Sequence, residues 1–314
     1  MSSVYSGVAG TPVTPYNSKG EIDYETFAKQ INFLIENGVR QIAAPMLIGE
    51  SVNLTESERR ELAKVLASAA GRRVPTFVNV SHASTDIAMQ MAEHAVKAGN
   101  TGVVIMAPYH WRAGQRALIE HFTAVADAAR GECMIVNDPK MTGVDIGSET
   151  LEKLIDRISK LVAIVDASGD MDIFTDICEL VARKAKPIAV FSGNEMLLST
   201  MPAGARGCFS MCSEVAPKLV QSLYQSCAIG VFGKVPPLQF KLRRLLKLLN
   251  HNAPANIKYA MELLDRPAGP TRRPVMPPSA DEKKWVKSEL TQLNIFDEEP
   301  SGWEFKRKPS RQSA

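Results

Sequence analysis

Short apolar runs alternate with longer amphipathic stretches along most of the chain. The short runs are rich in valine, isoleucine, alanine and phenylalanine and show little polar alternation, which is typical of parallel strands covered on both faces. We expect eight such strands, at residues 7–13, 41–47, 76–81, 103–107, 133–137, 162–166, 188–191 and 207–211.

The stretches between these runs carry helix signals. Phe27, Ile31 and Leu34 recur at helical spacing, and Asn37-Gly38 supplies a C-cap after them. Thr55 and Glu58 fit a capping box at the start of the next helix. Eight strand–helix alternations predict an α/β fold, a single (β/α)8 or TIM barrel. An open doubly wound sheet is disfavoured because its glycine-rich first turn is missing.

The C-terminal part of the sequence breaks this alternation. We place the barrel in residues 1–232. Residues 233–294 hold three more helical segments with too few apolar residues for a core of their own, so we expect a C-terminal helical appendix packed on the barrel. The last residues, 301–314, are polar, basic and rich in serine and proline, and we expect a disordered tail over residues 295–314.

Composition and charge exclude several classes of protein. The 314 residues are 45% hydrophobic and 23% charged, and the net charge of +3 gives no reason to expect a nucleic-acid partner. No apolar run approaches the roughly 20 residues of a membrane-spanning helix, and the N-terminus lacks a signal-peptide pattern. Five cysteines, an odd number, favour free thiols. We therefore expect a cytoplasmic protein without a membrane partner.

A series of short motifs follows the predicted strand ends. It runs Gly10-Thr-Pro-Val-Thr-Pro-Tyr16, Gly49-Glu50-Ser51, Ala107-Pro-Tyr-His110, Asn137-Asp-Pro139 with Thr142-Gly143, Ala167-Ser-Gly-Asp170, Ser192-Gly193, Gly204-Ala-Arg-Gly207 with Ser210, and Lys258-Tyr-Ala-Met. In these motifs, over roughly residues 4–293, the chain resembles the dihydrodipicolinate synthase / N-acetylneuraminate lyase family of class I aldolases.

The resemblance implies chemistry for which this chain lacks the side chains. Members of the family form an imine between a lysine on the sixth strand and a 2-oxo acid, and a tyrosine relays protons. Val165 stands at the position of that lysine and Val136 at that of the tyrosine. Leu47 and Ile48 replace the two threonines of the carboxylate-binding loop. We therefore do not expect standard Schiff-base aldolase activity.

Two further positions depart from the family in the same way. Met141 stands where many members carry a substrate-binding arginine, and His110 replaces the second tyrosine. We expect a lyase of dihydrodipicolinate synthase type that acts on a 2-oxo acid or related small molecule by an altered mechanism. The alternative is a non-catalytic pseudoenzyme that binds a small apolar ligand or an active paralogue. The resemblance also implies a homo-oligomer, a dimer or tetramer, and we expect no cofactor.

Polar residues at the predicted strand ends are the candidates for remaining chemistry. As catalytic candidates we name Lys140, His110, Tyr109, Asp138 and Asp166. Lys140 is either a displaced imine-forming amine or a solvated loop lysine. His82, His110, Asp138 and Asp166 offer mixed nitrogen and oxygen ligands, but their spacing encodes no metal site, and we predict none.

The substrate-binding candidates follow from the same strand ends. They are Leu47, Ile48, Gly49, Glu50, Val136, Met141, Val165, Gly193, Phe209 and Ser210. Glu50 also has a structural interpretation, because a carboxylate after a glycine can accept from neighbouring backbone N–H groups and hold its loop. Asn194 and Glu195 belong to the wider polar set at these ends.

Overall fold

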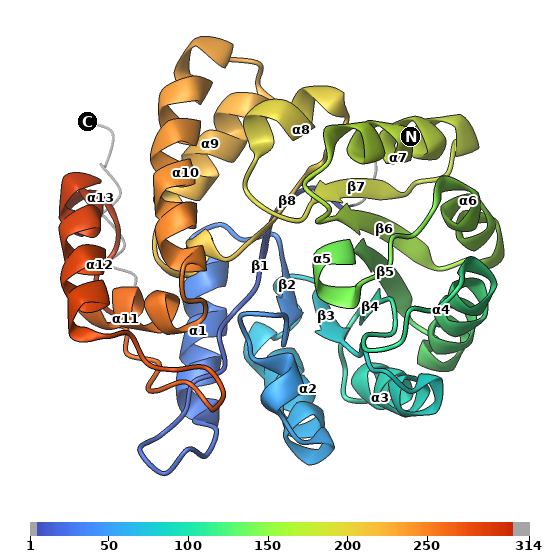
Figure 1. Ribbon diagram of the computed structural model, residues 1–314, viewed down its shortest axis with the longest axis horizontal. Helices are drawn as coiled ribbons and strands as arrows, with labels where there is room; N and C mark the ends of the chain where they lie inside the picture. The colour runs from blue at the N-terminus through green and yellow to red at the C-terminus, as the bar shows by residue number, and fades with distance from the viewer. Residues whose placement is uncertain (1–4, 304–314) are drawn as a thin grey trace, which may run out of the picture.

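The protein folds as a closed barrel of eight parallel strands in sequence order (Figure 1). The structure is a computed structural model that describes residues 5–303, without the side chain of Phe232. The strands are β1 Gly7–Gly10, β2 Gln41–Ala44, β3 Thr76–Asn79, β4 Gly102–Met106, β5 Glu132–Asn137, β6 Leu161–Asp166, β7 Ala189–Ser192 and β8 Gly207–Ser210. The predicted TIM barrel is confirmed, with every expected strand in place.

Helices connect successive strands, and all but the short α5, which lies over the end of β5, cover the outside of the barrel (Figure 1). They are α1 Tyr24–Glu36, α2 Glu56–Ala70, α3 Thr85–Lys97, α4 Gln115–Ala129, α5 Pro139–Thr142, α6 Ser148–Arg157, α7 Met171–Lys184, α8 Leu197–Ala203 and α9 Pro217–Ala228, with short turns η1 Ser51–Asn53, η2 Cys212–Glu214 and η3 Phe232–Lys234. Thr55 and Glu58 form the predicted capping box at the start of α2. Among the helices of residues 5–303, none has the length and apolar character needed to cross a membrane.

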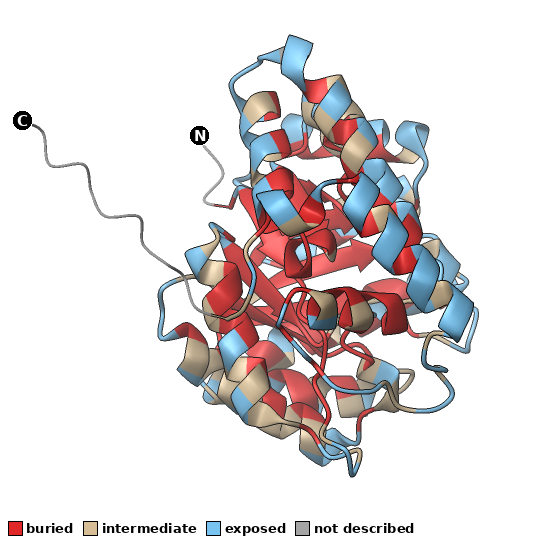
Figure 2. Cartoon of the chain, turned by 90° about the vertical axis from the view of Figure 1, so that its left-hand side faces the viewer, coloured by how far each residue is buried: buried red, intermediate tan, exposed pale blue. Residues whose placement is uncertain are grey.

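Alternation along each strand produces two separate apolar layers. Side chains such as Phe77, Met134 and Phe191 fill the inside of the barrel. Their neighbours, such as Val78, Ile135 and Val190, point outward and pack under the helices in a much larger core. Figure 2 shows the strands almost entirely buried and the outer helix faces exposed. The barrel is therefore a filled core that leaves room for a ligand only at its ends.

The C-terminal helices pack on one side of the barrel, beside α1 and α9 (Figure 1). They are α10 Val235–Asn250, α11 Ala255–Leu263, α12 Ala280–Gln292 and α13 Ile295–Glu298. Leu242, Leu245 and Leu249 of α10 are fully buried in the common core. The predicted appendix is confirmed.

The expectation of a disordered tail from residue 295 is wrong up to residue 303. Ile295 starts α13 and is buried, and the Glu299 carboxylate accepts hydrogen bonds from the backbone N–H groups of Lys218 and Leu219, both at 2.9 Å. A carboxylate at the N-terminus of a helix, here α9, satisfies donors that have no partner within the helix. Residues 304–314 of the expected tail lie outside the described residues.

Candidate functional site

A cavity of about 110 Å³ opens at the carboxyl ends of the strands, where TIM barrels carry their functional groups. Its walls are mainly aliphatic, thioether and aromatic side chains. The lining residues are Thr11, Met46, Leu47, Ile48, Met106, Val136, Asp138, Val165, Ala167, Gly193, Asn194, Glu195, Phe209 and Met211. Thr11, Asp138, Asn194 and Glu195 contribute its polar side chains.

Two adjacent valines line this cavity from inside the barrel. Val136 on β5 pairs in register with Val165 on β6, which pairs in turn with Phe191 on β7. Both valines are buried, with 4% and 1% of their surface exposed. Strand β6 contains no lysine. The two strands therefore present only aliphatic groups at these positions.

Six of the predicted substrate-binding residues line the cavity. They are Leu47, Ile48, Val136, Val165, Gly193 and Phe209. Gly49, Met141 and Ser210 do not line it, and the Met141 side chain is half exposed on α5. Thr11, Met46, Met106, Ala167 and Met211 line it although sequence reasoning did not single them out. The signal in the sequence that could have identified these five residues is their position at or just after the ends of the predicted strands.

Glu50 lies in a buried ion pair outside this cavity. Its Oε1 is 2.8 Å from Nζ of Lys258 in α11, and its Oε2 accepts from the backbone N–H of Arg272 at 2.9 Å. Burial lowers the pKa of Lys258 to about 8, and the Glu50 charge opposes this shift. Glu50 is not among the residues that line this cavity, and its role in substrate binding stays a prediction. Its structural interpretation fits, because the pair ties the loop after β2 to the appendix.

Glu195, which lines the cavity, follows β7 and has only 1% of its surface exposed. Its Oε1 accepts from the Ser210 hydroxyl at 2.7 Å and from the Cys212 backbone N–H at 2.9 Å. Its Oε2 has no hydrogen-bond partner among residues 5–303. Leaving a buried acceptor unsatisfied costs about 1–3 kcal/mol.

The appendix holds the segment that carries Glu195. Gln239 of α10 donates from Nε2 to the Glu195 carbonyl oxygen at 2.8 Å and accepts from the Leu198 backbone N–H at 3.0 Å. Gln239 is itself buried. One amide side chain thus fixes the backbone between β7 and α8 from outside the barrel.

Asp138 follows β5, and Asp166 is the last residue of β6. Asp138 lines the cavity, and its side chain also accepts from the Met141 N–H at 3.2 Å at the start of α5. Asp166 is buried and accepts from the Ser168 hydroxyl at 2.8 Å and the Asn137 amide at 3.0 Å. Burial raises the pKa of both carboxyl groups above the ordinary value.

Asp166 lines a second, smaller cavity of about 90 Å³ that shares Asn194 with the first. The remaining lining residues of this second cavity are Gly169, Asp170, Met171, Phe174, Ser192, Met196, Ser199 and Thr200. Asp170 also caps the N-terminus of α7. The two cavities therefore lie next to each other across Asn194.

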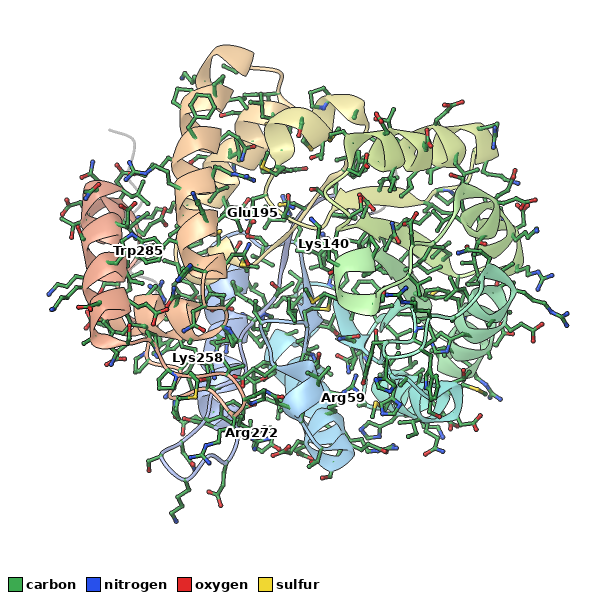
Figure 3. The ribbon with its side chains drawn as sticks, viewed as in Figure 1. Arg59, Lys140, Glu195, Lys258, Arg272 and Trp285 are labelled. Carbon is green, nitrogen blue, oxygen red and sulfur yellow. The ribbon has the colours of Figure 1, made fainter. Side chains whose placement is uncertain are left out.

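The exposed Lys140 extends from α5 toward the end of β6. A Cβ built on Gly169 would lie 3.1 Å from its Nζ, so the amine lies at the edge of the second cavity. Figure 3 shows Lys140 and Glu195 in the central part of the barrel, seen along the view of Figure 1. Lys140 does not line the larger cavity.

The candidates Tyr109 and His110, together with His82, lie apart from the cavity. Tyr109 packs edge-on against His82 with ring centroids 6.1 Å apart, and the exposed His110 against Trp111 at 5.5 Å. None of these side chains lines the cavity. Residues 5–303 contain no group of three or more histidine, cysteine or acidic side chains able to hold a metal ion. The metal alternative therefore has no ligand set in that range.

The closed parallel barrel with a cavity at the carboxyl ends of its strands places this protein in the class of TIM barrels. Comparison of its sequence with known families then identifies the family. A model of the dihydrodipicolinate synthetase family matches residues 4–293, and the chain belongs to this family. It is 28% identical to the 4-hydroxy-tetrahydrodipicolinate synthase of Bartonella bacilliformis, over 91% of this chain and 97% of that protein.

Solved structures agree with this assignment. A dihydrodipicolinate synthase from Thermotoga maritima is 27% identical, with a TM-score of 0.88 over 93% of this chain and 99% of that one. YagE, a prophage protein of the same family from E. coli solved in complex with pyruvate, is 25% identical, with a TM-score of 0.88 over 93% and 99% of the two chains.

Proposed function

We propose that this protein is a lyase that acts on a 2-oxo acid or related small molecule in the cavity at the barrel mouth, without an imine on β6. The single observation that carries this proposal is the valine pair. Val165 and Val136 lie in register on adjacent strands and line the cavity. The family resemblance assigns the imine lysine and the relay tyrosine to these two positions, and a valine side chain has neither an amine nor a hydroxyl.

The polar groups of the cavity supply acid–base chemistry in this proposal. Cleavage of a carbon–carbon or carbon–oxygen bond next to a carbonyl requires a group that takes and returns a proton. Asp138 lines the cavity, and burial raises its pKa, so it holds a proton more readily than an ordinary aspartate. We assign proton transfer to Asp138 and orientation of the carbonyl compound to Asn194.

Lys140 supports a second candidate mechanism. Its amine lies against Gly169, in the loop that follows β6, the strand that carries Val165. In this second mechanism the Lys140 amine, at the edge of the cavities, condenses with the substrate carbonyl to form an imine and releases water. A third possibility is a protein without catalytic activity. The apolar walls of the cavity would then bind a small apolar ligand, or the chain would bind an active paralogue.

Borohydride trapping with pyruvate distinguishes the two mechanisms. We expect no adduct in intact mass spectra of the wild-type protein. An adduct that maps to the Lys140 peptide and disappears in Lys140→Arg, which keeps the charge, would replace the first mechanism by the second. Lys153→Arg, on the exposed face of α6, is the matched control.

Turnover tests the lyase assignment itself. Consumption of a panel of 2-oxo acids and hydroxylated 2-oxo acids is followed by NMR with wild type and Asp138→Asn. We expect the variant to lose at least about a hundredfold in rate, the contribution typical of general acid–base catalysis. Turnover that is equal in both proteins removes Asp138 from the mechanism. Binding without any turnover supports the non-catalytic alternative.

A further inference from the structure

Among residues 5–303, the ionisable side chains that line the larger cavity are both carboxyl groups, those of Asp138 and Glu195. The lining contains no lysine, arginine or histidine in that range. The Lys140 amine lies outside it, against Gly169 at the edge of the second cavity. A carboxylate that leaves water needs a cation or several donors in exchange, because an unpaired buried charge is costly. The lining that the structure describes supplies no such cation.

Donors of Thr11 and Gly193, two residues that line the cavity, are already engaged. The backbone N–H and the hydroxyl of Thr11 both donate to the Ser210 carbonyl oxygen, at 3.3 and 3.0 Å. The Gly193 N–H donates to the Asp166 carbonyl oxygen at 2.7 Å. These donors cannot replace the hydration of a carboxylate without giving up their present bonds. The side-chain amide that the proposed function assigns to the carbonyl group, that of Asn194, is uncharged.

The rest of the wall is apolar and matches the body of a small aliphatic compound. Val136, Val165 and Phe209 line it from inside the barrel. Methionines at the ends of β2, β4 and β8 add flexible thioethers that adapt to the shape of a ligand, namely Met46, Met106 and Met211. The volume of about 110 Å³ is of the order of an engineered apolar cavity of ~150 Å³ that binds benzene. A body of a few carbon atoms therefore fits.

We propose that the cavity selects uncharged aliphatic carbonyl compounds, small ketones or aldehydes, over 2-oxo acid anions. This inference rests on the proposed function, because it names the substrate class of the same cavity. Such a compound keeps the carbonyl group that a lyase reaction needs and carries no carboxylate that would have to be desolvated beside two acidic side chains. Its affinity comes from apolar surface removed from water at the valine and methionine walls.

Probes of matched shape separate charge from apolar burial. Isobutyl methyl ketone and isovalerate share one branched body and differ only in a methyl group that replaces a charged oxygen. Acetone keeps the carbonyl group without the branched body, and pyruvate is the simple 2-oxo acid. We expect isobutyl methyl ketone to bind at least about tenfold more tightly than each of the other three in titrations near pH 8. The ranking is measured on the full-length wild-type protein and depends on no variant.

Methionine methyl groups report where the ligand binds. In NMR spectra of the protein with isotope-labelled methionine methyl groups, the ketone should shift the signals of Met46, Met106 and Met211, which line the cavity. The signal of Met276, which is exposed between α11 and α12 and does not line the cavity, is the control and should stay in place.

A variant tests the acidic lining. Asp138→Asn removes one negative charge and keeps an oxygen at the start of α5, so isovalerate affinity should rise about threefold or more while ketone affinity stays within about twofold. Glu36→Gln, at the exposed end of α1, removes the same charge far from the lining residues and should change neither affinity.

Each other outcome counts against the proposal. Isovalerate or pyruvate binding as tightly as the ketone overturns the selection against anions and leaves the proposed function in place, because a 2-oxo acid then fits the cavity. Equal affinities for acetone and isobutyl methyl ketone overturn the role of the apolar walls, and unchanged isovalerate affinity in Asp138→Asn overturns that of the acidic lining. Ketone shifts at Met276 alone overturn the location. Absence of binding by all four probes contradicts the ligand site itself, and the proposed function with it.

Discussion

Replacing Lys258 with methionine tests the buried pair that joins the barrel to its appendix. The Lys258 amine donates to Glu50 Oε1 at 2.8 Å and to the Pro270 carbonyl at 2.7 Å, and it lies 4.4 Å from the centre of the Tyr16 ring. The side chains of Lys258 and Glu50 are 3% and 1% exposed. Methionine preserves the length and apolar body of the side chain and removes only the charge and its donors.

The expected loss follows from what remains around Glu50. Breaking a buried pair by removing one partner costs about 3–5 kcal/mol because the other charge is left uncompensated. Oε2 keeps its bond from the Arg272 N–H, and the Arg272 guanidinium lies 4.5 Å from the centre of the same Tyr16 ring. We therefore expect the lower end of this range, a loss of about 3 kcal/mol in the free energy of unfolding.

Urea denaturation measures this loss. The exposed pair between Lys97 and Glu93, 2.7 Å apart with side chains 71% and 55% exposed, supplies the control. Lys97→Met should cost less than about 1 kcal/mol, as surface pairs do. Combining Lys258→Met with Glu50→Gln should recover part of the loss, because the buried charge is gone. A loss below about 1 kcal/mol for Lys258→Met, or a double variant no more stable than the single, would refute the reasoning.

Three further predictions follow from the site and its surroundings. Burial raises the pKa of Glu214 from 4.5 to about 8, although Arg266 opposes the shift, so the folded state holds a proton that the unfolded state releases. The free energy of unfolding should then fall as pH rises from 4.5 to about 8, and Glu214→Gln should flatten that slope in urea titrations; an unchanged slope contradicts it. Val165→Lys should create a pyruvate adduct that borohydride traps at that residue, because a lysine desolvated in this wall loses its proton more easily. Peptide mapping detects the adduct, and its absence would show that pyruvate does not reach residue 165. Light scattering should give the mass of a dimer or tetramer, and a monomer at all concentrations would contradict the oligomer prediction.

The periodicity of the chain was enough to predict the fold. Parallel strands buried on both faces must be nearly continuous apolar runs, and β4 and β6 are recognisable in the sequence for that reason. The capping box predicted at Thr55 and Glu58 stands at the start of α2. Val136 and Val165 were singled out by the family resemblance instead, and the barrel register places them side by side.

Side-chain direction could not be predicted in the same way. Glu50 follows a strand as Glu195 does, but Glu50 turns to Lys258, a residue 208 positions away in the sequence, while Glu195 turns to the cavity. Ile295 and Glu299 belong to a segment that is polar by composition, yet the N-terminus of α9 provides a partner for the Glu299 carboxylate. Both cases depend on contacts between distant segments, and local pattern carries no information about them.

The Gln239 amide connects the C-terminal helices to the candidate site. Its two hydrogen bonds, to the Glu195 carbonyl and from the Leu198 N–H, set where the segment between β7 and α8 lies, and that segment carries three of the cavity's lining residues, Gly193, Asn194 and Glu195. Under the proposed function, a change in the contacts of α10 displaces residues that line the cavity. Exchanging the appendix between two relatives is then expected to change ligand preference, and a search for altered specificity has as much reason to vary the contacts of α10 as the residues that line the cavity.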